Sequence, residues 1–332
     1  MKLLIIAGLA LGLSAPITAQ NEAPKFLFPA DCVLGQNCWI ARYMDRAAGA
    51  AKADHACQAQ TQDKHNGTDI VLADAGIMRA GVAVKAAAAG RVIAVRNGMP
   101  DIVVTEERSK TIQKQGCGNV LIVGHGNGWQ TRYCHLKKDS LLVKKGDRVS
   151  AGQVIAAVGL SGLTEFPHLH FMVQRNQQGQ KIQYFDPFDG GLYEGGCKAP
   201  DNLAPQSMWA QPIANAGAMV MPPIITTARL SREDMWQAQP QTLKKTVNAL
   251  IIQARGFHAL KGDEWRFTFV KPDGKIRKLE PVRQARDRQQ VRAFSGIKRP
   301  SGGFAPGLWQ ATVELIRAGQ SLGRRETWVT VE

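Results

Sequence analysis

The chain has 332 residues, with 42 Lys and Arg against 27 Asp and Glu, and a formal net charge of +15 at pH 7. Its hydrophobic share of 44% is that of a globular protein and excludes a disordered chain. The length allows two domains. The basic surplus favours anionic polymers or membrane surfaces as partners, although a solvated basic surface explains it equally well. Nucleic acid is not expected, because no nucleic-acid-binding motif accompanies the charge.

The N-terminal residues have the pattern of a secretory signal peptide. Lys2 precedes the apolar run 3–13, and the small residue Ala19 offers a cleavage site, so we expect residues 1–19 to be removed. The run is too short to span a bilayer, and no later stretch reaches that length. We therefore expect an exported protein, periplasmic or extracellular, without a transmembrane span. A retained N-terminal anchor is the alternative.

Six cysteines lie in the first two thirds of the chain. In an oxidising compartment an even number predicts disulfides. A cysteine metal site is the rival interpretation, but no pair has the close C-x-x-C spacing. Cys32 and Cys38 would close a short loop, and Cys117 and Cys134 bracket a predicted hairpin. Cys57–Cys197 is the pair left by elimination.

Short apolar runs separated by glycine turns fill the first part of the chain. Residues 119–125 and 129–135 flank the turn Gly126-Asn127-Gly128, which predicts a hairpin, and residues 168–173 predict a further strand. Turns near Gly146 are similar to those of lipoyl-carrier barrels. We therefore predict an all-β protein, in which residues 20–197 form a compact antiparallel domain, open and barrel-like, with lipoyl-like hairpins.

A proline-rich stretch with little periodicity, residues 198–225, predicts a connector. Alternating runs at 265–269, 309–315 and 327–331 follow it. They predict that residues 226–332 form a small β-sandwich, with an immunoglobulin-like arrangement as one form of it. A short helix is expected around residues 229–245. The role of this second domain stays open.

Two motifs offer metal ligands. His65 and Asp69 stand four apart, and Gly67 between them favours a loop over a helix. His168 and His170 stand two apart on a predicted strand, so both point to one face. Zinc accepts imidazole nitrogen and carboxylate oxygen. Two solvated histidines on an edge strand are the alternative for the second motif.

His135 is the fifth candidate. In a regular strand it shares a face with Tyr133, so we expect the two side chains to line one cleft. His125 is expected to have a structural or rim position. His55 and His258 are expected to be ordinary exposed histidines.

Three motifs, in their order and separations, resemble those of the lysostaphin-type (LytM-like) zinc metallopeptidases, which are peptidoglycan endopeptidases. The resemblance covers roughly residues 60–175 and does not reach residues 200–332. Two features depart from the family: bulky Glu165 and Phe166 before the last motif, and a charged insertion, residues 96–116, that forms either a wall of the groove or a solvated loop. The motifs are His65-x-Gly67-x-Asp69, Tyr133-x-His135-Leu136 and His168-x-His170.

The resemblance implies a function for each motif residue. His65, Asp69 and His170 would bind Zn²⁺, while His168 and His135 would be the catalytic pair, with His168 as the base or proton shuttle and the two roles open to exchange. The expected activity is hydrolysis of peptide cross-links in bacterial peptidoglycan by zinc-activated water. A non-catalytic regulator of cell-wall hydrolases and an exported metallopeptidase for a protein substrate are the alternatives.

Overall fold

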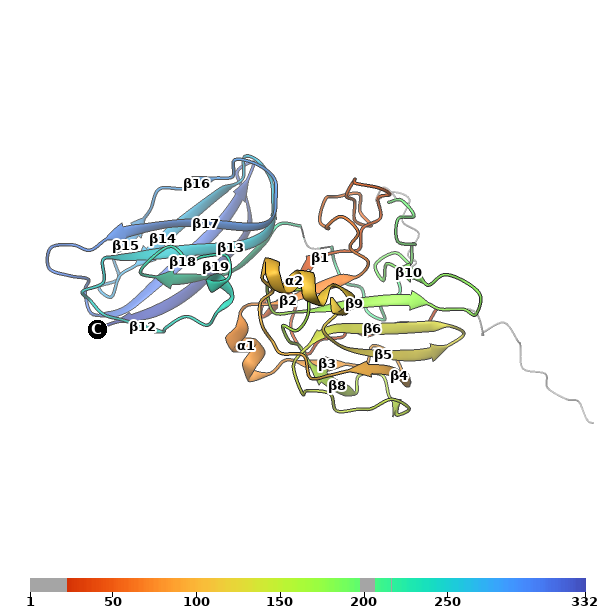
Figure 1. Cartoon of the computed structure of the whole chain (residues 1–332). Helices are drawn as coiled ribbons and strands as arrows, with labels where there is room; N and C mark the ends of the chain where they lie inside the picture. Colours follow the sequence, from red (N-terminus) through yellow and green to blue (C-terminus); the bar gives the residue numbers. More distant parts are fainter. Residues whose placement is uncertain (1–22, 198–206, 216) are drawn as a thin grey trace, which may run out of the picture.

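A computed structural model of the chain describes residues 23–197, 207–215 and 217–332. The predicted signal peptide, residues 1–19, and part of the predicted connector lie outside the described residues. The described chain forms two units side by side (Figure 1), which we call the N-terminal unit (residues 23–215) and the C-terminal unit (residues 217–332). No described helix is long and apolar enough to cross a membrane.

The described part of the N-terminal unit is built on one antiparallel sheet with the strand order β1-β2-β9-β6-β5-β4-β7, and β10 pairs with β9. A smaller antiparallel sheet pairs β3 (Ala83–Lys85) with β8 (Val154–Ala157). The larger sheet stays open rather than closing into a barrel. Its strands are β1 (Cys38–Arg42), β2 (Thr68–Leu72), β4 (Gly90–Arg96), β5 (Asn119–Gly126), β6 (Trp129–Leu136), β7 (Arg148–Val149), β9 (His168–Arg175) and β10 (Gln183–Phe185).

The hydrophobic core of this unit includes a segment that the sequence assigned to the connector. Trp209 is 4% exposed and stacks on Phe171, with ring centroids 5.6 Å apart. Its neighbour Met208 accepts a backbone hydrogen bond from Phe26. A single aromatic anchor among prolines leaves no periodicity, so the sequence pattern gave no sign of this packing.

The C-terminal unit contains two packed sheets, as the alternating pattern predicts. Trp265, Phe267 and Phe269 are all buried between them. One sheet starts at Met219 and not at residue 226. Its first strand contains Pro222 and Pro223, so the sequence pattern assigned it to the connector. The first sheet is β11 (Met219–Thr226), β13 (Ala249–Ala259) and β17 (Arg288–Lys298); the second is β12 (Thr242–Leu243), β19 (Gln320–Val331), β18 (Gly307–Arg317), β14 (Glu264–Val270), β15 (Ile276–Lys278) and β16 (Val282–Arg283).

The all-β prediction is confirmed, and helices in the described chain are short. Asp74 caps α1 (Ala75–Ala80), and Thr105 caps α2 (Glu106–Ile112), which leads into η2 (Gln113–Gln115). The helix expected around residues 229–245 is wrong in extent, since only η4 (Asp234–Trp236) forms there. Extended Gln237 ends η4 after one turn.

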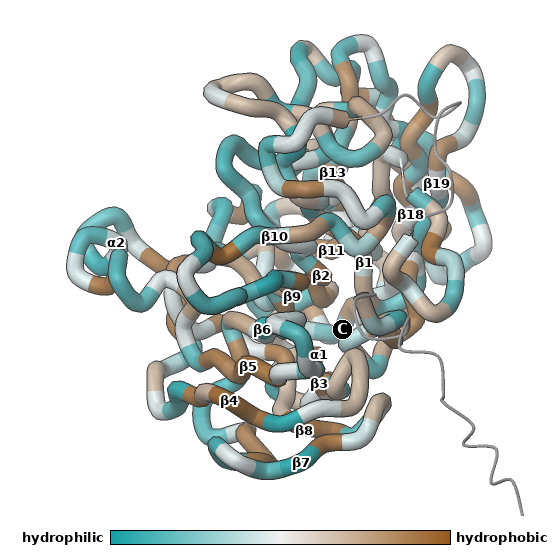
Figure 2. The backbone as a smooth tube through the Cα atoms, turned by 90° about the vertical axis from the view of Figure 1, so that its right-hand side faces the viewer, coloured by the Kyte–Doolittle hydropathy of each residue, from teal (hydrophilic) through white to brown (hydrophobic). Residues whose placement is uncertain are grey.

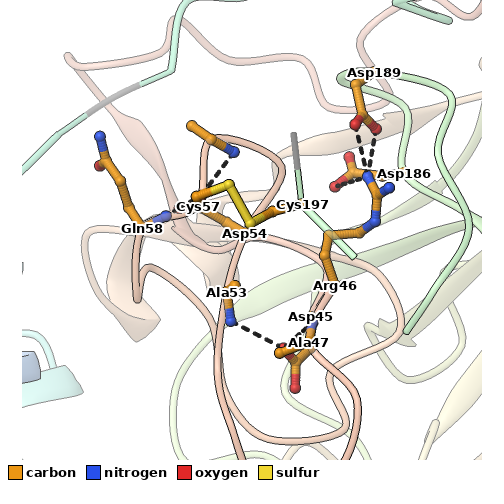
Figure 3. The surroundings of a disulfide bond; sticks show 11 residues. Asp45, Arg46, Ala47, Ala53, Asp54, Cys57, Gln58, Asp186, Asp189 and Cys197 are labelled. Carbon is orange, nitrogen blue, oxygen red and sulfur yellow. Dashed lines mark hydrogen bonds and ion pairs between the residues drawn. A yellow bond between two sulfur atoms is a disulfide. The ribbon is translucent and has the colours of Figure 1, made fainter. Parts of the chain in front are cut away.

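Three disulfides form with the expected pairing, Cys32–Cys38, Cys117–Cys134 and Cys57–Cys197. Figure 3 shows Cys57–Cys197 beside a buried charged cluster. There the Arg46 guanidinium contacts Asp189 at 2.6 Å and Asp186 at 4.0 Å. The link therefore ties the ends of a 140-residue stretch next to a buried network.

His55 belongs to this network, and the expectation that it is exposed is wrong. His55 and His258 are each 6% exposed, so the same expectation for His258 is also wrong. The His55 ring stacks on Phe188, with centroids 4.8 Å apart. Its Nδ1 lies 3.9 Å from Asp186 Oδ2. Burial lowers the pKa of His55 to about 4. Burial, with the neighbouring Asp189, raises the pKa of Asp186 to about 7.

We expect removal of the long-range disulfide to cost more stability than removal of the short one. Cys57→Ala with Cys197→Ala releases a loop of 140 residues, whereas Cys32→Ala with Cys38→Ala releases six. Loop-closure entropy predicts about 5 and about 2 kcal/mol as upper values. Urea unfolding of wild type and both double variants measures which disulfide contributes more to the free energy of unfolding. Equal losses, or a larger loss for the short loop, would contradict it.

Asp186→Asn should change how stability depends on pH. Between pH 4 and 6.5, the raised pKa of Asp186 makes stability fall as pH rises, since the native state keeps a proton that the unfolded chain has lost. The lowered pKa of His55 acts in the opposite direction and makes stability rise with pH over the same window.

The variant loses the Asp186 contribution. Its free energy of unfolding relative to wild type should therefore rise by up to about 1.4 kcal/mol per pH unit. Urea titrations at pH 4.5, 5.5 and 6.5 measure the free energy of unfolding of both proteins. If this free energy changed with pH in the same way for the variant and wild type, the account would be refuted.

Candidate metal site

Neighbouring strands bring the two ligand motifs together. Asp69 on β2 stands opposite His170 on β9, and His170 in turn stands opposite Cys134 on β6. His65 lies in the loop that enters β2. Because β9 is paired on both sides, His168 and His170 are on an interior strand and not on a solvated edge.

His65, Asp69 and His170 present their ligand atoms within 4.8 Å of one another. Asp69 Oδ1 lies 3.0 Å from His65 Nε2 and 2.7 Å from His170 Nδ1. His65 Nδ1 lies 2.6 Å from the Tyr43 carbonyl oxygen, which can only accept, so this nitrogen carries the proton. In the neutral ring, His65 Nε2 then points a lone pair at Asp69 Oδ1.

That arrangement fits a cation. His65 Nε2 is buried and makes no hydrogen bond, although it is in reach of the carboxylate. Two electron-pair donors facing each other repel unless a positive charge lies between them. Two imidazoles and one carboxylate are a donor set that zinc accepts, and a histidine whose other nitrogen donates to a carbonyl is typical of a metal ligand.

Gly67 makes room for this cluster. A Cβ atom at this position would lie 2.6 Å from the Phe171 carbonyl oxygen and 2.8 Å from His170 Nε2. A side chain at this position would therefore push β9 away from the loop. This contact gives a physical reason for the glycine in the first motif.

Asp69 is fully buried, and its second oxygen also has a cationic neighbour. Oδ2 lies 3.2 Å from the Arg42 guanidinium on β1. Burial alone would raise the pKa of Asp69, but the positive charge that the nearby His65 and His168 rings carry when protonated holds it well below its usual range. The group is therefore a carboxylate, the form that binds metal. No sequence motif pointed to Arg42, because its role arises only from the pairing of β1 with β2.

His168 and His135 lie beside the three candidate ligands. His168 Nε2 is 3.4 Å from Asp69 Oδ1, and the His135 and His168 rings are 4.5 Å apart between centroids. Each Nδ1 faces a carbonyl oxygen: Phe166 at 2.9 Å for His168, and Ser161 at 2.7 Å for His135. Both Nδ1 atoms are therefore donors, and in the neutral rings each Nε2 keeps a lone pair.

Burial favours the neutral form at two of these histidines. Burial and the neighbouring His168 hold the pKa of His135 well below its usual range. Burial also lowers the pKa of His170, against the opposing effect of Asp69. A neutral imidazole is the state that can accept a proton or bind a metal.

The expectation that Tyr133 lines the site with His135 is wrong. Tyr133 is completely buried in the core, and its hydroxyl oxygen accepts from the Ala87 amide at 2.8 Å and from the Thr131 hydroxyl at 2.9 Å. The reason is the backbone of His135, whose φ of +58° lies in the left-handed region. That conformation breaks the regular alternation of β6 and separates the two side chains.

The five residues open onto a cleft of about 620 Å³. The insertion forms part of its wall, since Val104 and Ser109 line it, and α2 projects from the body of the unit (Figure 2). Glu165 and Phe166 also line the cleft. His125 does not line this cleft; its ring bonds to Ala89 O and to Thr131 Oγ1, each at 2.8 Å.

Part of the N-terminal unit is similar to known proteins. Residues 63–183 match the family model described as peptidase family M23. Peptidoglycan DD-endopeptidase ShyA of Vibrio cholerae is 50% identical over 54 residues, which is 16% of this chain and 12% of the relative. ShyB of the same organism is 50% identical over 56 residues, 17% of this chain and 13% of the relative.

The uncharacterized lipoprotein YgeR of Escherichia coli is 28% identical over 176 residues, 52% of this chain and 56% of the relative. The matched part thus spans a small fraction of the DD-endopeptidases and about half of YgeR. Among solved structures, the catalytic domain of lysostaphin from Staphylococcus simulans is 24% identical, with a TM-score of 0.28, over 44% of this chain and 85% of that domain. Residues 63–183, which hold both ligand motifs and the cleft histidines, are a domain of peptidase family M23.

Proposed function

We propose that this chain is a zinc-dependent endopeptidase that hydrolyses peptide cross-links of bacterial peptidoglycan. The observation that carries the proposal is the buried His65 Nε2 atom, which makes no hydrogen bond and faces Asp69 Oδ1 at 3.0 Å in an M23 domain. The relatives named peptidoglycan DD-endopeptidases supply the substrate class.

In this proposal His65, Asp69 and His170 hold the zinc. Zinc bound there supplies a Lewis acid that polarises the scissile carbonyl and makes water acidic near neutral pH. His168 takes the proton from the attacking water at Nε2, since its Nδ1 is occupied by the Phe166 carbonyl. His135, held at Nδ1 by the Ser161 carbonyl, accepts a hydrogen bond from the attacking water at Nε2 and so orients it, and these two roles remain exchangeable.

We place the activity outside the cytoplasm, in the periplasm or beyond the cell. Three disulfides are the support for this, because such links persist in oxidising compartments. We further propose a peptidase domain followed by a C-terminal β-sandwich domain. The latter carries 20 Lys and Arg against 10 Asp and Glu from Met219 onward, which suits contact with an anionic wall polymer.

The first prediction concerns the metal. We expect the wild-type protein to bind one equivalent of zinc, and His65→Ala to weaken binding at least about 100-fold by removing a ligand. Isothermal titration with elemental analysis measures both values. His125→Gln, a histidine outside the cleft, is the matched control and should keep wild-type affinity. Absence of stoichiometric zinc in the wild-type protein would rule out the enzyme and favour a non-catalytic regulator of wall hydrolases.

The second prediction concerns the substrate. Wild type with zinc should convert cross-linked muropeptides of purified sacculi into uncross-linked species. His168→Ala should lower the rate by about 100-fold or more, since general-base catalysis contributes on that scale. Chromatography of the released muropeptides gives the readout, with His125→Gln again as control. Cleavage of an unstructured protein such as casein without loss of cross-links would instead indicate a protein substrate.

A further inference from the structure

The segment that leads into β9 orients His168 through hydrogen bonds among its own residues. The Thr164 hydroxyl donates to the Phe166 carbonyl oxygen at 2.8 Å and lies 3.0 Å from His168 Nδ1. The same Phe166 carbonyl oxygen accepts from His168 Nδ1 at 2.9 Å. The direction of the His168 ring therefore depends on where the Phe166 backbone lies.

The Phe166 side chain is held by the C-terminal unit. It is 1% exposed, and its ring centroid lies 4.9 Å from that of Trp236 and 6.0 Å from that of Phe257. It also contacts the His168 ring at 4.9 Å between centroids and the Arg42 guanidinium at 5.2 Å. The Phe166 ring thus contacts both the C-terminal unit and the candidate catalytic residue His168.

The aromatic residues behind Phe166 are fixed in turn. The Arg255 guanidinium lies over the Trp236 ring at 5.5 Å and is itself buried. It donates to the Met235 carbonyl oxygen at 2.8 Å and, across the boundary between the units, to the Ala73 carbonyl oxygen at 2.6 Å. The buried cluster at this boundary takes side chains from both units: Trp39, Ala41, Val71, Ala73, Phe166, Met219, Met221, Trp236 and Phe257.

An exposed pair at the rim adds little to this support. Arg232 and Glu165 are 3.3 Å apart, but their side chains are 58% and 40% exposed. Ion pairs in such positions contribute little to stability. The rigid contact between the C-terminal unit and the cleft is therefore the aromatic one.

We infer that Trp236 and Phe257 are positioning residues for His168, acting through the ring and the carbonyl group of Phe166. The C-terminal unit is on this account a structural part of the active site and not only an appended wall-binding module. The inference rests on the proposed function for its catalytic consequence. The orientation of His168 can be measured without it.

Trp236→Ala tests the inference in the full-length, zinc-loaded protein. It removes the support of Phe166 and leaves all candidate ligands in place. With a purified cross-linked muropeptide we expect kcat to fall about 10- to 100-fold, the range for loss of groups that orient ligands or catalytic residues. KM and zinc affinity should change less than about threefold. Trp236→Phe should restore most of kcat, and Trp328→Ala, on a ring that is 49% exposed, is the matched control.

A spectroscopic measurement separates this inference from the proposed function. In protein labelled with ¹⁵N-histidine, the Nδ1 proton of His168 should be visible and protected from exchange in wild type and Trp328→Ala. It should exchange rapidly in Trp236→Ala. If wild type cleaves no muropeptide, the proposed function fails, and this proton signal still decides the positioning role.

Two results would overturn the inference. One is a Trp236→Ala protein with unchanged kcat and a protected His168 proton. The other is a loss of kcat only in parallel with zinc affinity, which would indicate general damage. Should Trp236→Ala not fold, Phe257→Leu replaces it with the same expectations, because Phe257 contacts Phe166 from the neighbouring strand β13.

Discussion

The fully buried carboxylate of Asp69 is the constraint on which the N-terminal unit depends. An ionised carboxylate away from water is costly unless cations and hydrogen-bond donors surround it. Arg42 approaches Oδ2 from β1 and His170 Nδ1 donates to Oδ1 from β9, while the Nε2 atoms of His65 and His168 also face Oδ1. The strand order β1-β2-β9 supplies these neighbours, with Asp69 in the middle strand. The fold thus creates a site where a further positive charge at Oδ1 would be stabilised.

Three of the histidines around Asp69 are held at Nδ1, the ring nitrogen that points away from the carboxylate. Carbonyl oxygens of Tyr43, Phe166 and Ser161 face the Nδ1 atoms of His65, His168 and His135. Backbone carbonyls fix the tautomer without adding charge to a buried site. Only His170 directs Nδ1 toward Asp69 itself. The site therefore has a defined set of lone pairs before any ligand arrives.

The motif residues could be predicted because each motif is a short stretch of sequence. A His-x-His pair on a strand and a glycine between His65 and Asp69 can be recognised without knowing the fold. Arg42 and Thr164 were missed, since each acquires its role from pairing or loop geometry that no local pattern records. Tyr133 was misplaced because strand alternation assumes regular φ values, and His135 departs from them. The strand from Met219 was missed because Pro222 and Pro223 within it resemble connector composition.

The boundary between the units combines buried apolar side chains with buried hydrogen bonds. Burial lowers the pKa of Arg255 to about 10, and its two terminal nitrogens donate to carbonyl oxygens of Ala73, Met235 and Pro222. Separating the units would break the bond to Ala73 and expose the aromatic cluster around Phe166. A hinge at this boundary would therefore cost both polar and apolar contacts. Because Phe166 contacts both Trp236 and His168, the position of the C-terminal unit is coupled to that of His168.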